Sequence, residues 1–324
     1  RRAWAGGKSL RAASAGGRIA GSDEVTMLEV SRAMLHGRLV VPGGATRVGR
    51  GGAFYSKNAA GQAVLALPLV AVAELAARAM PSARRELAAR AMISFFNAVV
   101  TAALLGAFYA GVRTLGAGAG AAFAGALLLG FTTPLWVYAK SFMAEPLEAL
   151  GLLLALLGAG QVRAGQASAA RTAAAGLAIA ACAKLSVLPM ALLCLSPLLG
   201  APRSAWRWPL AALAFTLVAH GVYDFARFGN PFETGYGAQA TPAAYTTPLV
   251  VGLYGLLLSS GKGAMWFAPV LWLVPAGLAA MRSRDAAVGA PVAARAAVAR
   301  AVVLAAVAAL LIYGRFQHWA GDGS

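Results

Sequence analysis

Long apolar stretches separated by short arginine-bearing links are the feature that most constrains how this chain folds. From about residue 53 to residue 313, runs rich in Ala, Leu, Val and Phe recur, and several approach the roughly 20 residues that an α-helix needs to cross a bilayer. Only 12% of the 324 residues are charged, whereas about a quarter are charged in soluble domains. In lipid, a spanning segment must satisfy its own backbone hydrogen bonds, which a helix does. The sequence therefore predicts an all-α, polytopic transmembrane helical bundle.

The apolar stretches define the expected helices. We expect spans over residues 91–112, 118–138, 145–160, 209–225, 264–281 and 299–313, and a pair over 172–184 and 186–199 that is broken near Lys184 and Pro189. The stretch 53–80 contains Pro68 and Glu74, so we expect an interfacial or re-entrant helix there instead of a span. Residues 1–20 are basic and rich in Gly and Ala, and we expect them to be poorly ordered, whereas 21–324 form the transmembrane domain. Because the chain starts at Arg1 and stops at Ser324 without a terminating signal, we expect it to be a fragment, with further chain at both ends.

The stretch 21–42, GSDEVTMLEVSRAMLHGRLVVP, organises the rest of the chain. The pair Asp23–Glu24 stands where a helix would begin, and negative charge is favourable at a helix N-terminus. On a helical wheel the apolar side holds Met27, Leu28, Val30, Met34 and Leu35, and the polar side holds Glu29, Arg32 and His36. Such a two-faced helix favours a membrane surface over a span, with the acidic pair at the water boundary. The alternative is that Asp23 only caps the helix.

The distribution of arginine predicts the orientation in the membrane. The net charge is +17, with basic residues concentrated in the links after residues 160, 199 and 281. Cytoplasmic links of membrane proteins carry the excess of Lys and Arg, so the links 139–144, 225–247 and 315–324 are expected on the extracytoplasmic face. The cluster Arg84, Arg85 and Arg90 is an exception, because it would then lie outside. In a chain this apolar, the positive charge indicates contact with anionic membrane lipids and no nucleic-acid partner.

Several common chemistries have no sequence support. The two cysteines, Cys182 and Cys194, lie within apolar runs and show no disulfide or metal pattern. The three histidines have no ligand spacing, so no metal site is expected from them. Neither a phosphate-binding GxxxxGK[ST] loop nor a GxSxG nucleophile motif occurs. A nucleotide-driven enzyme and a serine hydrolase are therefore not expected.

The polar residues expected on the extracytoplasmic face combine carboxylates with cations. A carboxylate can act as a general base, and cations hold a phosphate and stabilise the charge that develops on it. This combination suits a lipid-linked phosphate sugar. The candidate catalytic residues are Asp23, Glu24 and Glu145, and the candidate substrate-binding residues are Tyr55, Lys57, Lys140, Lys184, Arg227 and Lys262.

Each candidate also has a structural interpretation. Lys184 lies in an apolar run, where a charge costs about 2.5–3.5 kcal/mol on insertion scales, and it could extend to the surface instead. Glu145 precedes Pro146 at the start of an expected helix and could simply favour that N-terminus. Lys57 and Lys262 could anchor lipid headgroups.

Several of these segments also resemble a known family. SDEVTMLEVSRAMLHGRLVVP and AFYSKNAAGQAVLALP resemble the first external loop of the GT-C superfamily glycosyltransferases, in the family of lipid A aminoarabinose transferase and the protein O-mannosyltransferases (glycosyltransferase family 39). TTPLWVYAKSFMAEPLEALGLLLAL is similar to the second external loop and the following span, and AGLAIAACAKLSVLP to a Gly-rich span that ends in a lysine. YDFARFGNPFETGYG and LLLSSGKGAMWFAPV resemble segments of uncharacterised bacterial members. The resemblance runs in the same order from Gly21 to Asp322 and is most specific in the Asp-Glu loop.

The resemblance implies a GT-C type bundle whose external loop carries amphipathic juxtamembrane helices. It implies transfer of a sugar from a polyprenyl-phosphate carrier to a glycan, lipid or protein acceptor, at the outer face of the cytoplasmic (inner) membrane. Asp23 would be the catalytic base, Glu145 would support the site, and Lys57, with Lys184 as a second candidate, would hold the carrier phosphate. The family leaves room for a divalent cation as a cofactor. The family also has a span before the first loop, which this chain lacks.

Two other classes of function stay open at this stage. A flippase or transporter for lipid-linked sugars would also use charges within the membrane and broken helices such as the one near Pro189. A non-catalytic membrane subunit that binds glycan lipids is the third alternative.

Overall fold

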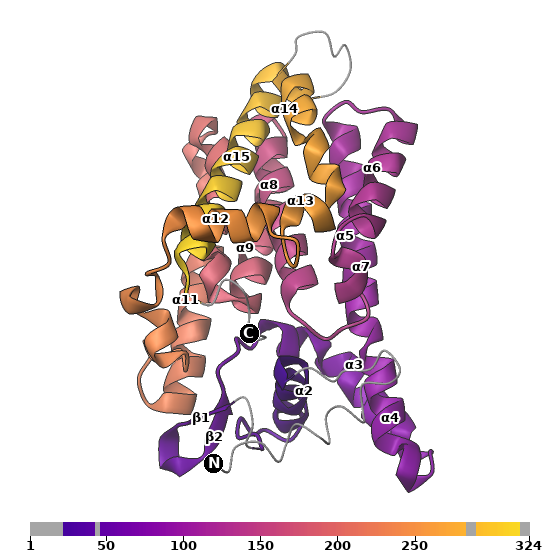
Figure 1. Ribbon diagram of the computed structural model, residues 1–324, viewed down its shortest axis with the longest axis vertical. Helices are drawn as coiled ribbons and strands as arrows, with labels where there is room; N and C mark the ends of the chain where they lie inside the picture. Colours follow the sequence, from indigo (N-terminus) through magenta and orange to yellow (C-terminus); the bar gives the residue numbers. More distant parts are fainter. Residues whose placement is uncertain (1–21, 43–45, 283–289, 318–324) are drawn as a thin grey trace.

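Apolar helices packed side by side form the body of this protein (Figure 1). The computed structural model describes residues 22–42, 46–282 and 290–317, so the predicted disorder of residues 1–20 concerns a segment outside the described residues. Within those ranges, five helical segments are long and apolar enough to cross a membrane: Gly61–Arg78, Ser82–Thr114, Glu145–Arg163, Arg203–Phe228 and Val292–Arg315. The prediction of an all-α multi-pass membrane protein is confirmed.

The helices follow one another along the chain with short breaks. Their order is α2 (Ser22–Leu35), α3 (Gly61–Arg78), α4 (Ser82–Ile93), α5 (Phe95–Thr114), α6 (Ala119–Phe131), α7 (Leu135–Tyr138), α8 (Glu145–Arg163), α9 (Ala170–Ala183), α10 (Leu188–Cys194), α11 (Arg207–Phe228), α12 (Leu249–Leu258), α13 (Ala264–Phe267), α14 (Val274–Arg282) and α15 (Val292–Arg315). A small antiparallel hairpin of β1 (Thr46–Val48) and β2 (Phe54–Ser56) pairs Arg47 with Tyr55. Neither this hairpin nor α12 was predicted from the sequence.

Proline explains where two predicted spans are wrong. The stretch 118–138 is interrupted because α6 ends at Phe131, before Pro134. The stretch 264–281 is divided into α13, a 3-10 helix over Pro269–Leu273 and α14, because Pro269 lacks the backbone N–H that would continue α13. The break predicted near Lys184 is present: α9 ends at Ala183, and Lys184 adopts an extended conformation with φ −159° and ψ 116°.

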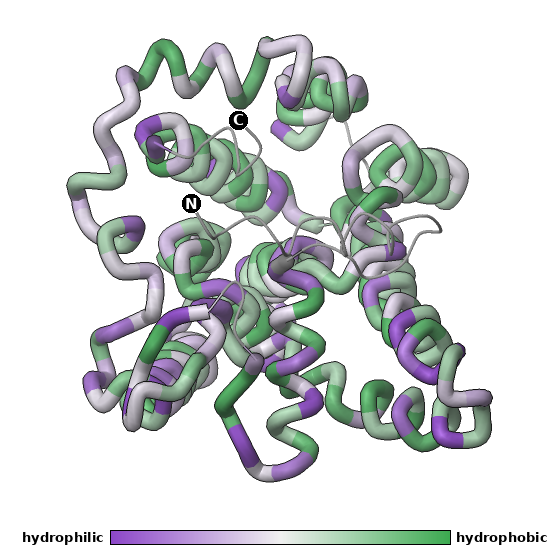
Figure 2. Tube along the Cα trace, turned by 60° about the horizontal axis from the view of Figure 1, so that its bottom comes forward, coloured by the Kyte–Doolittle hydropathy of each residue, from purple (hydrophilic) through white to green (hydrophobic). Residues whose placement is uncertain are grey.

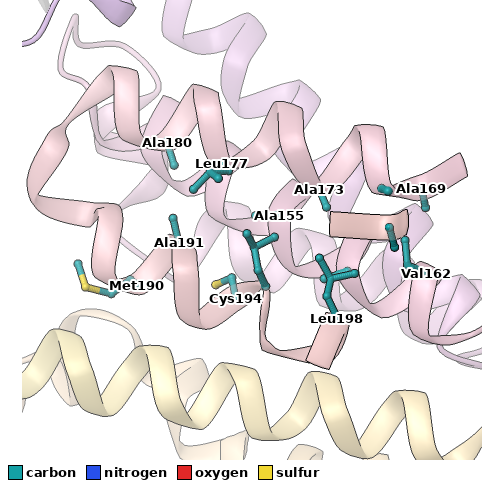
Figure 3. Packing of buried hydrophobic residues seen from close by; sticks show 14 of the residues in the cluster. Ala155, Val162, Ala169, Ala173, Leu177, Ala180, Met190, Ala191, Cys194 and Leu198 are labelled. Carbon is teal, nitrogen blue, oxygen red and sulfur yellow. The ribbon is translucent and has the colours of Figure 1, made fainter. Parts of the chain in front are cut away.

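The largest core cluster joins α8, α9 and α10, and α8 and α9 approach each other closely within it (Figure 3). The cluster is rich in alanine, including Ala155, Ala173 and Ala180. A Cβ added at Gly176 would overlap backbone atoms of α8, so only glycine permits this separation between the helices. Small residues of this kind let membrane helices pack closely. At the start of α6 glycine has no such role, since a Cβ added at Gly118 or Gly120 would meet nothing within 4 Å, whereas Gly125 and Gly130 further along α6 lie against side chains of α5.

Helix α2, the hairpin, α3 and α4 lie at one end of the bundle (Figure 1). Arg32 of α2 forms ion pairs with Glu29 at 2.8 Å, with Glu74 of α3 at 2.7 Å and with Glu86 of α4 at 2.8 Å. The polar side of α2 therefore contacts protein, and the prediction of a two-faced surface helix is wrong in this respect. Its apolar side is only partly as expected, because Leu28 is buried while Leu35 is exposed.

Helix α3 is compatible both with a membrane span and with an interfacial position. It meets the length and hydropathy of a span, with Pro68 inside it. Its exposed side is apolar, with Val64, Leu65, Val72 and Leu75 all about half exposed or more. That face is typical of contact with lipid, so the interfacial placement of residues 53–80 stays a prediction.

Candidate functional site

Every acidic residue in the described ranges belongs to segments at the end of the bundle that holds α2. These residues lie in α2, in the α3–α4 hairpin, in the first turn of α8, and in and after the last turn of α11. Figure 2 brings this end toward the viewer. Many hydrophilic residues lie in the loops at this end, in front of helices that are mostly hydrophobic. Besides the Arg32 cluster of α2 and the buried Arg227–Asp224 pair, two partly exposed ion-paired groups lie here.

The first group joins α2 to the segment after β2. The Lys57 ammonium lies 3.9 Å from the Asp23 carboxylate, and it also lies over the Tyr236 ring, 5.7 Å from its centroid. The Asp23 side chain is 37% exposed and that of Lys57 is 22% exposed. At this distance the pair is an ion pair without a direct hydrogen bond, so both charges are free to bind a further partner.

The second group joins the break after α9 to the first turn of α8. The Lys184 ammonium lies 3.6 Å from the Glu145 carboxylate and 3.7 Å from that of Glu148. Glu145 and Glu148 are one helical turn apart, and both gain from the positive N-terminal end of the α8 dipole. One ammonium is thus shared by two carboxylates, so the group has an excess of negative charge when both carboxylates are ionised.

Tyr236 connects the two groups electrostatically. Burial raises the pKa of the Tyr236 hydroxyl; Asp23 and Glu148 reinforce this increase, and Lys184 opposes it. These effects require Tyr236 to lie near both groups. Next to it, a Cβ added at Gly235 would lie 3.2 Å from Lys57 Cα, so the loop after α11 packs directly on Lys57. At neutral pH Tyr236 is a protonated hydroxyl and a hydrogen-bond donor.

The loop that carries Glu145 into place is held by buried polar side chains from three helices. Glu24 of α2 accepts a 2.7 Å hydrogen bond from Phe142 N–H, and Gln62 of α3 donates a 2.9 Å hydrogen bond to the Phe142 carbonyl. Asn97 of α5 donates a 2.7 Å hydrogen bond to the Met143 carbonyl. Glu24 is only 8% exposed, and its carboxylate holds the loop in place through this hydrogen bond. The sequence had predicted a catalytic role for it.

Arg227 and Tyr55 also lie inside the protein. The Arg227 side chain is 2% exposed, pairs with Asp224 and donates to the Ser56 carbonyl. Tyr55 is 8% exposed and packs edge-on against Phe228. These contacts hold the segment before Lys57 against α11. Both residues therefore position Lys57, whereas the sequence predicted that they would contact the substrate directly.

Lys140 and Lys262 are exposed and lie apart from these ion pairs. The Lys140 ammonium lies 5.4 Å from the centroid of the Trp136 ring. Lys262 follows α12, and its backbone N–H donates to the Ser259 hydroxyl. The structure therefore brings together Asp23, Lys57, Lys184 and Glu145, and it leaves Lys140 and Lys262 on the surface.

Glu148 was not identified from the sequence, and Tyr236 was expected on this face but was not among the candidate site residues. Glu148 follows Glu145 by three residues in EPLEALG, a spacing that puts both on one side of a helix, and this was the available signal. Tyr236 lies in a loop without helical periodicity, and nothing local distinguishes it from the other tyrosines.

A hollow of about 330 Å³ borders this site on the far side of the loop after α11. It is lined by Arg47, Val48, Gly49, Phe228, Glu233, Gly235 and Gly237. Arg47 donates a 3.1 Å hydrogen bond to the Gly235 carbonyl and thereby fixes the wall between the hollow and Lys57. For a metal, the described ranges contain no group of three or more His, Cys, Asp or Glu side chains that could hold one, so the divalent cation stays a prediction.

Comparison with known proteins assigns no family to this arrangement. No family model matches the chain, and no curated protein and no solved structure matches it. By helix length and hydropathy the chain is a multi-pass membrane protein with its acidic residues gathered at one end, as far as the described residues extend.

Proposed function

We propose that this chain is a GT-C type membrane glycosyltransferase that moves a sugar from a polyprenyl-phosphate carrier to an acceptor hydroxyl. The observation that carries the proposal is the partly exposed pair of Asp23 and Lys57, 3.9 Å apart, with a second lysine, Lys184, at the same end of an apolar bundle. A base beside a phosphate-binding cation is the arrangement that this transfer needs.

The reaction is an inverting displacement. Asp23 takes the proton of the acceptor hydroxyl while the acceptor oxygen forms a bond to the anomeric carbon. The bond between that carbon and the phosphate oxygen breaks, and the electron pair leaves with the polyprenyl phosphate. Lys57 and Lys184 stabilise the negative charge of the leaving phosphate, and Glu145 and Glu148 hold Lys184 in place before the donor binds.

The charge distribution supports an extracytoplasmic site in the cytoplasmic membrane. Arg163 at the end of α8, Arg171 near the start of α9 and Arg203 before α11 belong to links opposite the acidic end. The positive-inside rule puts such links in the cytoplasm. The acidic end also carries basic residues. These are the cluster of α4, which is partly neutralised because Glu86 pairs with both Arg90 and Arg32, and Arg47 and Arg50 of the hairpin segment.

The test is to incubate the purified full-length protein with labelled polyprenyl-phosphate sugars and candidate acceptors in vesicles. Loss of sugar from the carrier, with free polyprenyl phosphate as the second product, supports the transferase. Movement of intact lipid-linked sugar across the vesicle would make the protein a transporter, and binding alone would make it a glycan-lipid binding subunit. Against a transporter, the described acids gather at one end of the bundle, whereas transporters place their charged sites near the midplane.

A further inference from the structure

Glu148 is a buried carboxylate whose charge depends on one exposed lysine. The Glu148 side chain is 10% exposed and that of Lys184 is 38% exposed, so the lysine is the member of the pair that has access to water. The Glu148 oxygen that faces Lys184 is buried and forms no hydrogen bond, and the Glu145 oxygen that is turned away from Lys184 is also buried without one. The nearest cation, Lys184, lies 3.7 Å away and is shared with Glu145.

Moving Lys184 away would leave this carboxylate in an unfavourable state. Burial disfavours the charged form of a carboxylate unless an opposite charge or hydrogen bonds compensate for it. The other ionisable groups that face Glu148 are Glu145 on the same helix, Tyr138 of α7 and Tyr236 of the loop after α11. None of these carries a positive charge, so none can replace the lysine.

We infer that binding of the donor's phosphodiester is coupled to uptake of a proton by Glu148. When Lys184 turns from Glu148 to the phosphodiester anion, a proton from water binds to the Glu148 carboxylate and forms the neutral acid. When the phosphate leaves, Lys184 returns and the proton is released to water. The inference rests on the proposed function, because it takes Lys184 to be a phosphate ligand, and it adds a proton-coupled step to donor binding.

Asp23 and Glu145 differ from Glu148 in their access to water. The Asp23 side chain is 37% exposed and that of Glu145 is 36% exposed, whereas that of Glu148 is 10% exposed. Of the three carboxylates, Glu148 is therefore the one for which water cannot take the place of the lysine.

The experiment measures protons bound per ligand by calorimetry in buffers of different ionisation enthalpy, on purified full-length protein in lipid nanodiscs. The probe is farnesyl methyl phosphate, a diester that keeps one negative charge throughout the neutral range and has no sugar to transfer. Binding of wild-type protein is expected to take up a substantial fraction of one proton near neutral pH. The affinity should then fall with rising pH by up to about tenfold per unit, as linkage requires for one coupled proton.

Variants identify the residue that takes up the proton. In Glu148→Gln the uptake should disappear, whereas Glu233→Gln, which removes a carboxylate from the loop after α11, should keep it. Lys184→Met should bind more weakly and take up no proton, because Glu148 is then already neutral. The Lys184→Met variant therefore tests the coupling even if the Glu148→Gln protein does not fold. Binding without proton uptake by the wild type would overturn this inference and leave the transferase proposal standing, and so would unchanged uptake in Glu148→Gln. No binding of the diester at all would overturn both.

Discussion

The Glu24 carboxylate accepts a 2.7 Å hydrogen bond from the backbone N–H of Phe142, 118 residues further along the chain. This contact ties the first turn of α2, which carries Asp23, to the loop that leads into Glu145. From the other side, Gln62 donates to the carbonyl of the same residue. The backbone of Phe142 thus links the helix turn that carries Asp23 to the loop before Glu145, and Asp23 and Glu145 are two carboxylates of the proposed site.

Replacing Glu24 should therefore disturb Glu145 without removing any group that we place at the substrate. A hydrogen bond to a charged group contributes about 1.5–3 kcal/mol, so Glu24→Ala should lower the free energy of unfolding by that order. Its kcat for sugar transfer should fall as well. Glu24→Gln keeps an acceptor oxygen and should retain most of both properties. Thermal unfolding and initial transfer rates measure the two effects, and a Glu24→Ala protein with normal stability and normal kcat would contradict the positioning role.

Asp23→Asn should abolish most of the sugar transfer while the fold persists. A positioned general base contributes typically about 10²–10⁴-fold in rate, so kcat should fall by that factor. The side chain is 37% exposed and its one ion pair is 3.9 Å long, so little stability depends on the charge. The measurement is kcat together with donor binding, with Glu29→Gln, a carboxylate change on the same helix, as the control. Transfer at the wild-type rate by Asp23→Asn would remove Asp23 from the catalytic role.

Lys57→Met should weaken donor binding more than a change at any surface lysine. Loss of a charge-assisted contact to phosphate costs about 1.5–3 kcal/mol, which corresponds to roughly a 10- to 100-fold higher Kd. Lys140→Met and Lys262→Met are matched controls, because both lysines were also substrate-binding candidates in the sequence and both are exposed in the structure. Equal effects of all three variants on donor affinity would indicate general attraction to anionic lipid and would contradict a phosphate site at Lys57.

The bundle could be predicted because hydropathy and proline act locally. Helices α8 and α11 fall where the apolar runs predicted them, with ends shifted by up to three residues, and α15 begins seven residues earlier than predicted. The errors at 118–138 and 264–281 came from treating an apolar run as a helix despite an internal proline. Helix α12 was missed because its run is short, and its place beside α15 depends on tertiary contacts such as Thr247 N–H to the Arg315 carbonyl.

The site could be predicted less completely, because residue type does not reveal burial. Asp23, Lys57, Glu145 and Lys184 were identified from charge in an apolar chain, and the structure places them at one end. Arg227 was selected for the same reason, yet it is buried and forms an ion pair with Asp224. Glu24 follows Asp23 directly, so the helix turns it about 100° away and into the protein. Such differences depend on which elements surround a side chain, and that information is non-local.

Close packing between α8 and α9 gives a prediction about stability that is independent of the proposed chemistry. Gly176→Ala should destabilise the protein by about 1–3 kcal/mol, the usual cost of overpacking, because the new Cβ would overlap the backbone of α8 at Ala155. Gly106→Ala in the middle of α5 is the matched control, since a Cβ there meets nothing within 4 Å. Alanine is favoured over glycine in a helix by about 1 kcal/mol, so this variant should be as stable as the wild type or more so. Thermal unfolding in the same detergent measures both. If Gly176→Ala unfolds at the same temperature as Gly106→Ala, the two helices do not pack at the separation described.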